Sequence, residues 1–90
     1  MRDAVIVSFL DSPPKSDALT DYDRAHLVLY LQVLDAEADG ADWRDVVRVV
    51  FEIEPDDDLK RAKLIHDSHL ARARWMTEIG YRLLLLQGKP

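Results

Sequence analysis

Three short acidic segments show where helices can begin in this chain. They read TDYD at residues 20–23, DWRD at residues 42–45 and PDDD at residues 55–58. Each offers side-chain oxygens that accept hydrogen bonds from the free N–H groups of a first helical turn, and negative charge is favourable there because that end of a helix is positive. The sequence therefore predicts three or four helices with short connections, in a small all-α domain.

The helix that should follow Thr20 is apolar over most of its surface. Thr20 and Asp23 are spaced as a capping box, and Gly40 can adopt the left-handed conformation that ends helices. The apolar residues recur at helical spacing and leave only a narrow polar side, so we expect this helix to be the most buried one. They are Leu27, Tyr30, Leu31, Leu34 and Ala38, with Val28, Leu29 and Val33 beside them.

Two further helices are expected after Gly40. The second begins at its cap, Asp42, and ends near residues 51–54. The third runs from about Asp58 to Ile79, with a last apolar turn at residues 82–86. A short helix joined by a tight turn to a longer, basic helix is typical of a helix-turn-helix.

Before Thr20 the sequence predicts an extended arm. Residues 5–10 read VIVSFL, which favours a β-strand, but no other segment offers a partner strand. Pro13 and Pro14 then prevent regular structure. We expect an arm and linker at residues 1–19, a helix-turn-helix-like domain at residues 20–86 and a tail at residues 87–90.

Several classes of protein and site are excluded by what the sequence lacks. There is no cysteine, so disulfides and thiolate metal sites are impossible. No apolar run is long enough to span a bilayer, and no recognisable catalytic motif is present. His66 and His69 lie three residues apart, but a metal site needs a third ligand. We expect a cytoplasmic protein that is not an enzyme and needs no metal or cofactor, with His66 partly buried and His69 at the surface.

Charge is distributed unevenly along the chain. The net charge is −5, yet residues 1–58 hold 15 acidic and 5 basic side chains while residues 59–90 hold 2 and 7. An acidic protein is poorly attracted to DNA, because DNA affinity comes from cations that neutralise phosphates. Asp67 lies four residues after Lys63, where it can pair with that lysine and repel phosphates. The basic third still offers a candidate DNA-binding face, which consists of Lys60, Arg61, Lys63, Arg72 and Arg74.

Three segments of the chain, LQVLDAEADGADWRDVVRVVFE, LARAR and IGYRLLL, together resemble the RovC-like DNA-binding domain family over roughly residues 24–86. The resemblance implies a helix-turn-helix fold and a role in transcription regulation. Members that bind DNA tend to carry arginines through the centre of the third helix, where this chain has His66, Asp67 and Ser68. The chain is more similar to small, acidic, stand-alone members. These bind a related, FseA-like activator of the same family and keep it from switching on conjugative transfer of an integrative element.

The main functional prediction is therefore an antiactivator that works through protein contact. Aromatic and arginine side chains dominate binding hot spots, and the LLLL run at residues 83–86 needs a cover, which the arm, a second copy or a partner can supply. The predicted partner-binding residues are Trp43, Arg44, Arg48, His66, Asp67, Trp75, Tyr81, Leu84 and Leu85. We expect weak or no nucleic-acid binding, no membrane binding and weak self-association. A DNA-binding helix-turn-helix transcription factor is the alternative, and a structural module without a regulatory target is a third.

Overall fold

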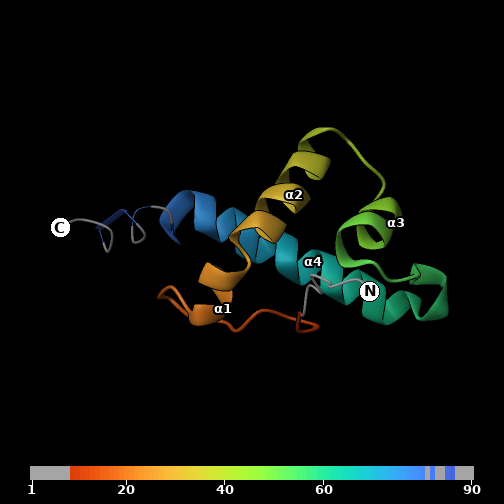
Figure 1. Ribbon diagram of the computed structural model, residues 1–90, viewed down its shortest axis with the longest axis horizontal. Helices are drawn as coiled ribbons and strands as arrows, with labels where there is room; N and C mark the ends of the chain where they lie inside the picture. The colour runs from red at the N-terminus through yellow and green to blue at the C-terminus, as the bar shows by residue number, and fades with distance from the viewer. Residues whose placement is uncertain (1–8, 81, 83–84, 87–90) are drawn as a thin grey trace, which may run out of the picture.

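The computed structural model describes residues 9–80, 82, 85 and 86 of the chain. Within these residues it contains four α-helices and no strand, which confirms the all-α prediction (Figure 1). The helices are α1 (Asp21–Ala25), α2 (Leu27–Ala38), α3 (Trp43–Val46) and α4 (Leu59–Trp75). α3 continues as a π-helical turn (Val47–Phe51), a 3-10 turn (Pro55–Asp57) precedes α4, and a second π-helical turn (Met76–Gly80) follows it.

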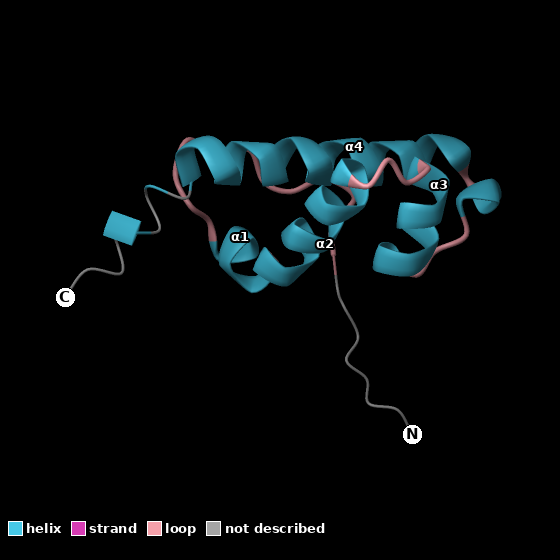
Figure 2. Ribbon diagram, turned by 90° about the horizontal axis from the view of Figure 1, so that it is seen from above, coloured by secondary structure: helices cyan, strands magenta, loops and turns pink. Residues whose placement is uncertain are grey.

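Helix α4 is the longest helix that the structure describes. The other three helices all lie on one side of it, as the view from above shows (Figure 2). Its buried residues are Ala62, Ile65, His66, His69, Leu70, Arg72 and Ala73, whereas α2 buries Leu29, Tyr30 and Val33. The expectation that the helix after Thr20 is the most buried one is therefore wrong. α4 takes that place because α1, α2, α3 and the linker all pack against it.

The predicted helix starts agree with the structure. The capping box is present, since the Asp23 N–H donates to Thr20 Oγ1 at 3.1 Å and the Thr20 N–H donates to Asp23 Oδ2 at 3.0 Å. Asp42 accepts from the Arg44 N–H at 2.9 Å, and Asp58 accepts from the Arg61 N–H at 3.0 Å. Each bond satisfies a donor that the first turn of a helix leaves free.

The single helix expected from Thr20 to Gly40 is broken at His26. The backbone there has φ −118° and ψ 24°, outside the helical region, so α1 and α2 are separate helices. His26 Nδ1 lies 2.8 Å from the Tyr22 carbonyl oxygen, and the two rings stack with centroids 3.9 Å apart. A side chain that joins the backbone hydrogen-bond ladder is a recognised cause of such a bend. Gly40 follows the end of α2 and has the left-handed conformation that was predicted, with φ 76°.

The N-terminal linker runs along α4. Asp11 pairs with Arg61, the Ser68 hydroxyl donates to the Asp11 carbonyl oxygen at 3.1 Å, and Phe9 packs edge-on against Phe51 with centroids 5.0 Å apart. The predicted strand lies outside the described residues except for Phe9 and Leu10, which are not in a strand. The prediction that the arm covers the LLLL run likewise falls mostly outside the described residues.

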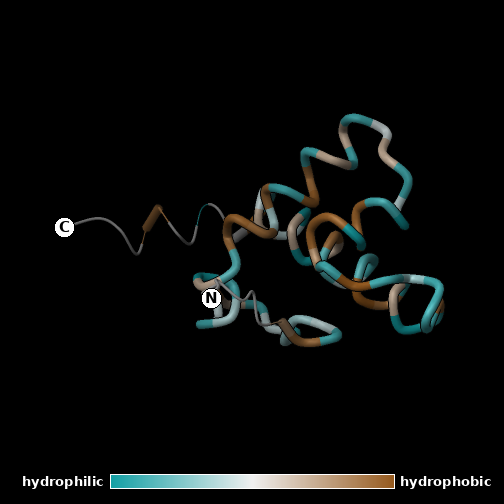
Figure 3. The backbone as a smooth tube through the Cα atoms, turned by 45° about the vertical axis from the view of Figure 1, so that its right-hand side comes forward, coloured by the Kyte–Doolittle hydropathy of each residue, from teal (hydrophilic) through white to brown (hydrophobic). Residues whose placement is uncertain are grey.

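The helices are amphipathic, with hydrophobic and hydrophilic stretches alternating along the backbone (Figure 3). The apolar residues gather in one core, to which Val33 of α2, Phe51 after α3 and Ile65 of α4 each contribute. Among the described residues, no helix has the length and hydropathy needed to cross a membrane.

Candidate functional site

Four of the predicted partner-binding residues meet at one surface. Trp43, in the first turn of α3, faces α4, where Lys63 Nζ lies 5.0 Å from its ring centroid. The Arg44 guanidinium lies at the same distance from the ring, and the His66 ring is 6.1 Å away. We call Trp43, Arg44, Lys63, His66 and Asp67 the Trp43 surface. It presents a half-buried indole with two cations close to its ring, an arrangement that cation–π attraction favours.

Asp67 links two members of the Trp43 surface. Its Oδ1 lies 2.8 Å from His66 Nδ1 and 3.4 Å from Lys63 Nζ. Partial burial would raise the pKa of the Asp67 carboxyl, but the hydrogen bonds from His66 and Lys63 outweigh it and hold the pKa below its usual value. The carboxylate therefore stays charged and neutralises Lys63. This is the pairing that the four-residue spacing predicts.

Three other basic residues of α4 are paired in the same way. Arg61 lies 3.0 Å from Asp11 of the linker, and Arg74 lies 2.9 Å from Glu37 of α2. Arg72 pairs with Asp23 of α1 at 2.5 Å. Of the five candidate DNA-binding residues, only Lys60 makes no ion pair with another residue that the structure describes. The candidate DNA-binding face is thus largely neutralised by carboxylates of the same chain.

Arg72 belongs to the interior of the molecule, with 9% of its surface exposed. Its guanidinium donates to both oxygens of Asp23 and to the carbonyl oxygens of Ser16 and Ala18, at 2.7 and 3.0 Å. Trp75 covers its face at 3.8 Å. These contacts hold the linker and α1 against α4. Arg72 therefore has a structural role and does not present its charge to a phosphate.

Asp23, which the sequence suggested only as a capping residue, is the acidic partner at the centre of this network. It is fully buried and also accepts from the Tyr30 hydroxyl at 2.7 Å. Burial alone would raise the pKa of the Asp23 carboxyl, but the bonds from Arg72, Thr20 and Tyr30 lower it to about 2. Burial and the adjacent carboxylate raise the pKa of the Tyr30 hydroxyl. The network is therefore a charged Asp23–Arg72 pair with neutral Tyr30.

His69 is also fully buried, so the expectation that it lies at the surface is wrong. Its Nδ1 lies 2.7 Å from the Ile65 carbonyl oxygen and its Nε2 lies 2.6 Å from the Tyr22 hydroxyl, which in turn accepts from the Leu10 N–H at 3.1 Å. All these bonds form together when neutral His69 carries its proton on Nδ1 and the Tyr22 hydroxyl donates to Nε2. The imidazole thus ties the linker to α1 and α4.

Folding stability is expected to fall as pH falls below about 6.5, the usual pKa of histidine. Burial lowers the pKa of His69, so the unfolded chain binds a proton that the folded chain excludes. The stabilisation is complete above the unfolded pKa and is lost as pH falls toward the folded one, at about 1.4 kcal/mol per unit of pKa difference. Urea unfolding followed by circular dichroism at pH 7.5 and pH 5.0 measures this. A His69→Phe variant should show a smaller loss, and an equal loss would mean that other groups cause it.

The remaining predicted partner-binding residues do not join the Trp43 surface. Trp75 lies on another flank of α4, against Arg72 and the linker. Arg48 pairs with Asp45 at 3.0 Å and Glu54 at 3.3 Å, beyond the end of α3. Leu85 is exposed, and Tyr81 and Leu84 lie outside the described residues.

His66 and His69 are not arranged as ligands of one metal ion. The two histidines of α4 are buried in different surroundings, since His66 faces Trp43 whereas His69 faces Tyr22 and Phe51. In the part of the chain that the structure describes, no three histidine, aspartate or glutamate side chains gather in a way that could hold a metal ion.

The arrangement defines a class of protein: a small helical domain with a helix-turn-helix-like layout, in which short α3 leads through a tight connection into the longer, basic α4. The family model RovC_DNA-bd, described as "T6SS, Transcription factor, DNA binding domain", matches residues 6–86. The chain therefore belongs to this family, as its sequence suggested. The family is one of transcription factor domains and not of enzymes, which supports a role in transcription regulation. No curated protein matches the chain.

Proposed function

We propose that this protein regulates transcription as an antiactivator, by binding a related, FseA-like activator of its own family. The observation that carries the proposal is that four of the five basic candidates on α4 are already paired with carboxylates of the same chain. DNA affinity depends on cations that are free to neutralise phosphates. Each paired cation must lose a carboxylate before it can gain a phosphate, so the gain in affinity is small. The likeness to small, acidic, stand-alone members of the family, of which the antiactivator QseM is an example, suggested this role and stays a prediction.

The Trp43 surface is the proposed contact with the activator. Tryptophan and arginine are the residues most enriched at energetic centres of protein interfaces, and Trp43 is held in place by Lys63 and Arg44 without being fully covered. A rigid aromatic side chain loses little conformational entropy on binding. Trp43 is therefore suited to be an anchor, with Arg44 contributing a charged contact beside it.

DNA binding is the second candidate, and family membership favours it. Lys60, Arg61, Lys63 and Arg74 all reach solvent, and water screens their surface ion pairs, which makes the carboxylates exchangeable. Arg72 would take no part in this binding while it holds Asp23. The two candidate functions differ in what binds to α4, which is the phosphate backbone of DNA in one and a protein in the other.

A binding experiment with the activator tests the proposal. The purified chain is mixed with a related activator of the same family, and complex formation and release of the activator from its DNA are measured together. We expect the chain to bind and to displace the DNA, and Trp43→Ala to weaken binding at least tenfold, or about 1.4 kcal/mol. Val49→Ala is the matched control, because Val49 is 76% exposed and lines a different groove, between α2 and α3.

Each result has a separate meaning. If no complex forms at micromolar concentrations, the antiactivator proposal is wrong. If a complex forms but Trp43→Ala and Val49→Ala behave alike, the activator binds elsewhere than at the Trp43 surface. Circular dichroism of both variants must show unchanged helix content, since Trp43 also packs against α4.

A further inference from the structure

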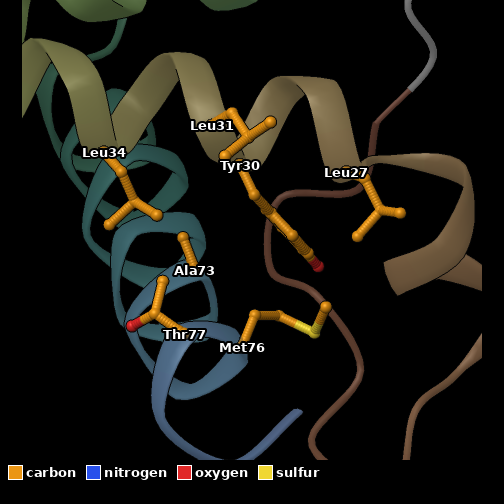
Figure 4. Close-up of a pocket in the computed structure, with 7 residues that line it drawn as sticks. All are labelled: Leu27, Tyr30, Leu31, Leu34, Ala73, Met76 and Thr77. Atoms are coloured by element: carbon orange, nitrogen blue, oxygen red, sulfur yellow. The ribbon is translucent and has the colours of Figure 1, made fainter. Parts of the chain in front are cut away.

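An apolar groove lies between α2 and the end of α4, away from the Trp43 surface. Its volume is about 240 Å³, and the side chains that line it are Leu27, Tyr30, Leu31, Leu34, Ala73, Met76 and Thr77 (Figure 4). The two polar side chains among these are occupied, because the Tyr30 hydroxyl donates to Asp23 and the Thr77 hydroxyl donates to the Arg74 carbonyl oxygen. The lining side chains thus offer apolar surface, which suits another apolar side chain and not a polar small molecule.

The groove coincides with the most regular apolar stripe of the sequence. Leu27, Leu31 and Leu34 follow helical spacing, yet α2 turns a neighbouring set of residues into the core. Leu31 remains 59% exposed, and Val28 beside it remains 69% exposed. An amphipathic helix that lays such a stripe along a groove is a common mode of protein recognition. This face of α2 therefore has the pattern of a helix-packing surface that the described chain leaves open.

The same chain carries exposed apolar residues that match this groove. Leu85 and Leu86 are helical, are 55% and 68% exposed, and form the hydrophobic segment near the C-terminus in Figure 3. They follow Ile79, which is exposed as well. Apolar side chains of this size exposed together are unusual in a monomer and indicate a contact surface.

Charge complements the apolar match. Residues 79–90 contain Arg82 and Lys89 and no acidic residue, whereas α2 contains Asp35 and Glu37 and no lysine or arginine. Glu37 is paired with Arg74, so Asp35 is the acidic side chain of α2 that is left to attract the positive charge of a C-terminal segment. Complementary charge favours the encounter and fixes the orientation of the segment.

We propose that the groove binds the C-terminal segment of a second copy of this chain, with Leu85 and Leu86 of each copy packed against Leu31 and Met76 of the other. The contact is reciprocal, so two copies form a closed dimer with twofold symmetry in which both grooves are filled. Each copy supplies one groove and one segment, which doubles the apolar area buried by the single contact. This dimer is independent of the activator proposed as the target.

Measuring the oligomeric state of the full chain over a range of concentrations tests the proposal. Sedimentation equilibrium should show a dimer that dissociates on dilution. Leu31→Asp places a charge in the groove and should weaken the dimer at least tenfold, whereas Val49→Asp, at a more exposed valine outside the groove, should leave it unchanged. A chain that stays monomeric up to millimolar concentration would overturn the proposal. A monomer that Leu31→Asp destabilises would show that the groove is filled by the chain's own segment, which also overturns it.

Single cysteines identify the contact directly, since the chain has none of its own. Leu31→Cys and Leu85→Cys chains are prepared separately, mixed and oxidised under mild conditions. A disulfide forms only when the two Cα atoms are within about 7 Å. The mixed product should therefore exceed the two self-linked products taken together, which it would only equal if pairing were random. A dimer that gives no excess of the mixed product has another interface, and the proposed arrangement is then wrong.

Discussion

Replacing Arg72 with alanine is expected to leave the domain largely unfolded. Asp23 is fully buried, and its charge is compensated by Arg72. Removing one partner of a buried ion pair costs about 3–5 kcal/mol because the other charge is left uncompensated. Native domains are stable by only about 5–15 kcal/mol, and this one is small. Arg72→Ala also releases the carbonyl oxygens of Ser16 and Ala18, so the linker should detach. Urea unfolding followed by circular dichroism measures the loss.

Arg74→Ala is the matched control for Arg72→Ala. It removes the same kind of side chain two residues away, but its ion pair with Glu37 is exposed, so we expect a loss below about 1 kcal/mol. The double variant Asp23→Asn/Arg72→Met removes both charges and should be more stable than Arg72→Ala alone. If Arg72→Ala unfolds at nearly the same urea concentration as the wild type, Arg72 is not structural. It then becomes available again as a phosphate contact.

Replacing His69 with alanine is expected to cost about 2–4 kcal/mol, from a cavity and from unsatisfied polar groups together. The imidazole fills a site between Phe51 and Tyr22, and it satisfies both the Tyr22 hydroxyl and the Ile65 carbonyl oxygen. His69→Phe fills most of this volume and should lose less stability than His69→Ala. Thermal unfolding at pH 7.5 compares the two variants. A loss below about 0.5 kcal/mol for His69→Ala is the behaviour of a surface residue and would contradict the observed burial.

Helix starts and the helical class were predictable because they depend on local interactions. Thr20, Asp42 and Asp58 each bond an N–H two or three residues ahead, so the information lies within one turn. The break at His26 was not predicted, because histidine is no regular helix breaker and the bend rests on its contact with Tyr22.

Long-range pairings were not predictable from the sequence. Asp23 has the spacing of an ordinary capping residue, and nothing local distinguishes Arg72 from Arg61 or Arg74 as its partner. The distinction arises because α4 turns Arg72 toward α1 and leaves Arg74 beside Glu37. The one available signal was that Arg72 lies on the same side of the helix as Ile65 and His69, a set that includes apolar and aromatic residues.

The candidate interaction surface was predicted in part. Trp43, Arg44, His66 and Asp67 meet because α3 packs on α4, which the helix-turn-helix layout implies. The sequence missed Lys63 as a partner of the indole and missed the groove beside α2. Apolar residues surround α2 on nearly every side, so periodicity alone does not choose which of them enter the core.

Binding to duplex DNA at low salt tests most directly whether α4 is neutralised by the chain's own carboxylates. Fluorescence anisotropy with a mixed-sequence duplex compares the wild type with Asp11→Asn/Glu37→Gln/Asp67→Asn, which frees Arg61, Arg74 and Lys63 while leaving the buried Asp23–Arg72 pair intact. We predict no measurable binding for the wild type at about 50 mM salt, and salt-sensitive binding for the triple variant, with a slope that reflects about three phosphate contacts. Tight binding by the wild type with a steep salt dependence would contradict this, and it would make the protein a DNA-binding transcription factor.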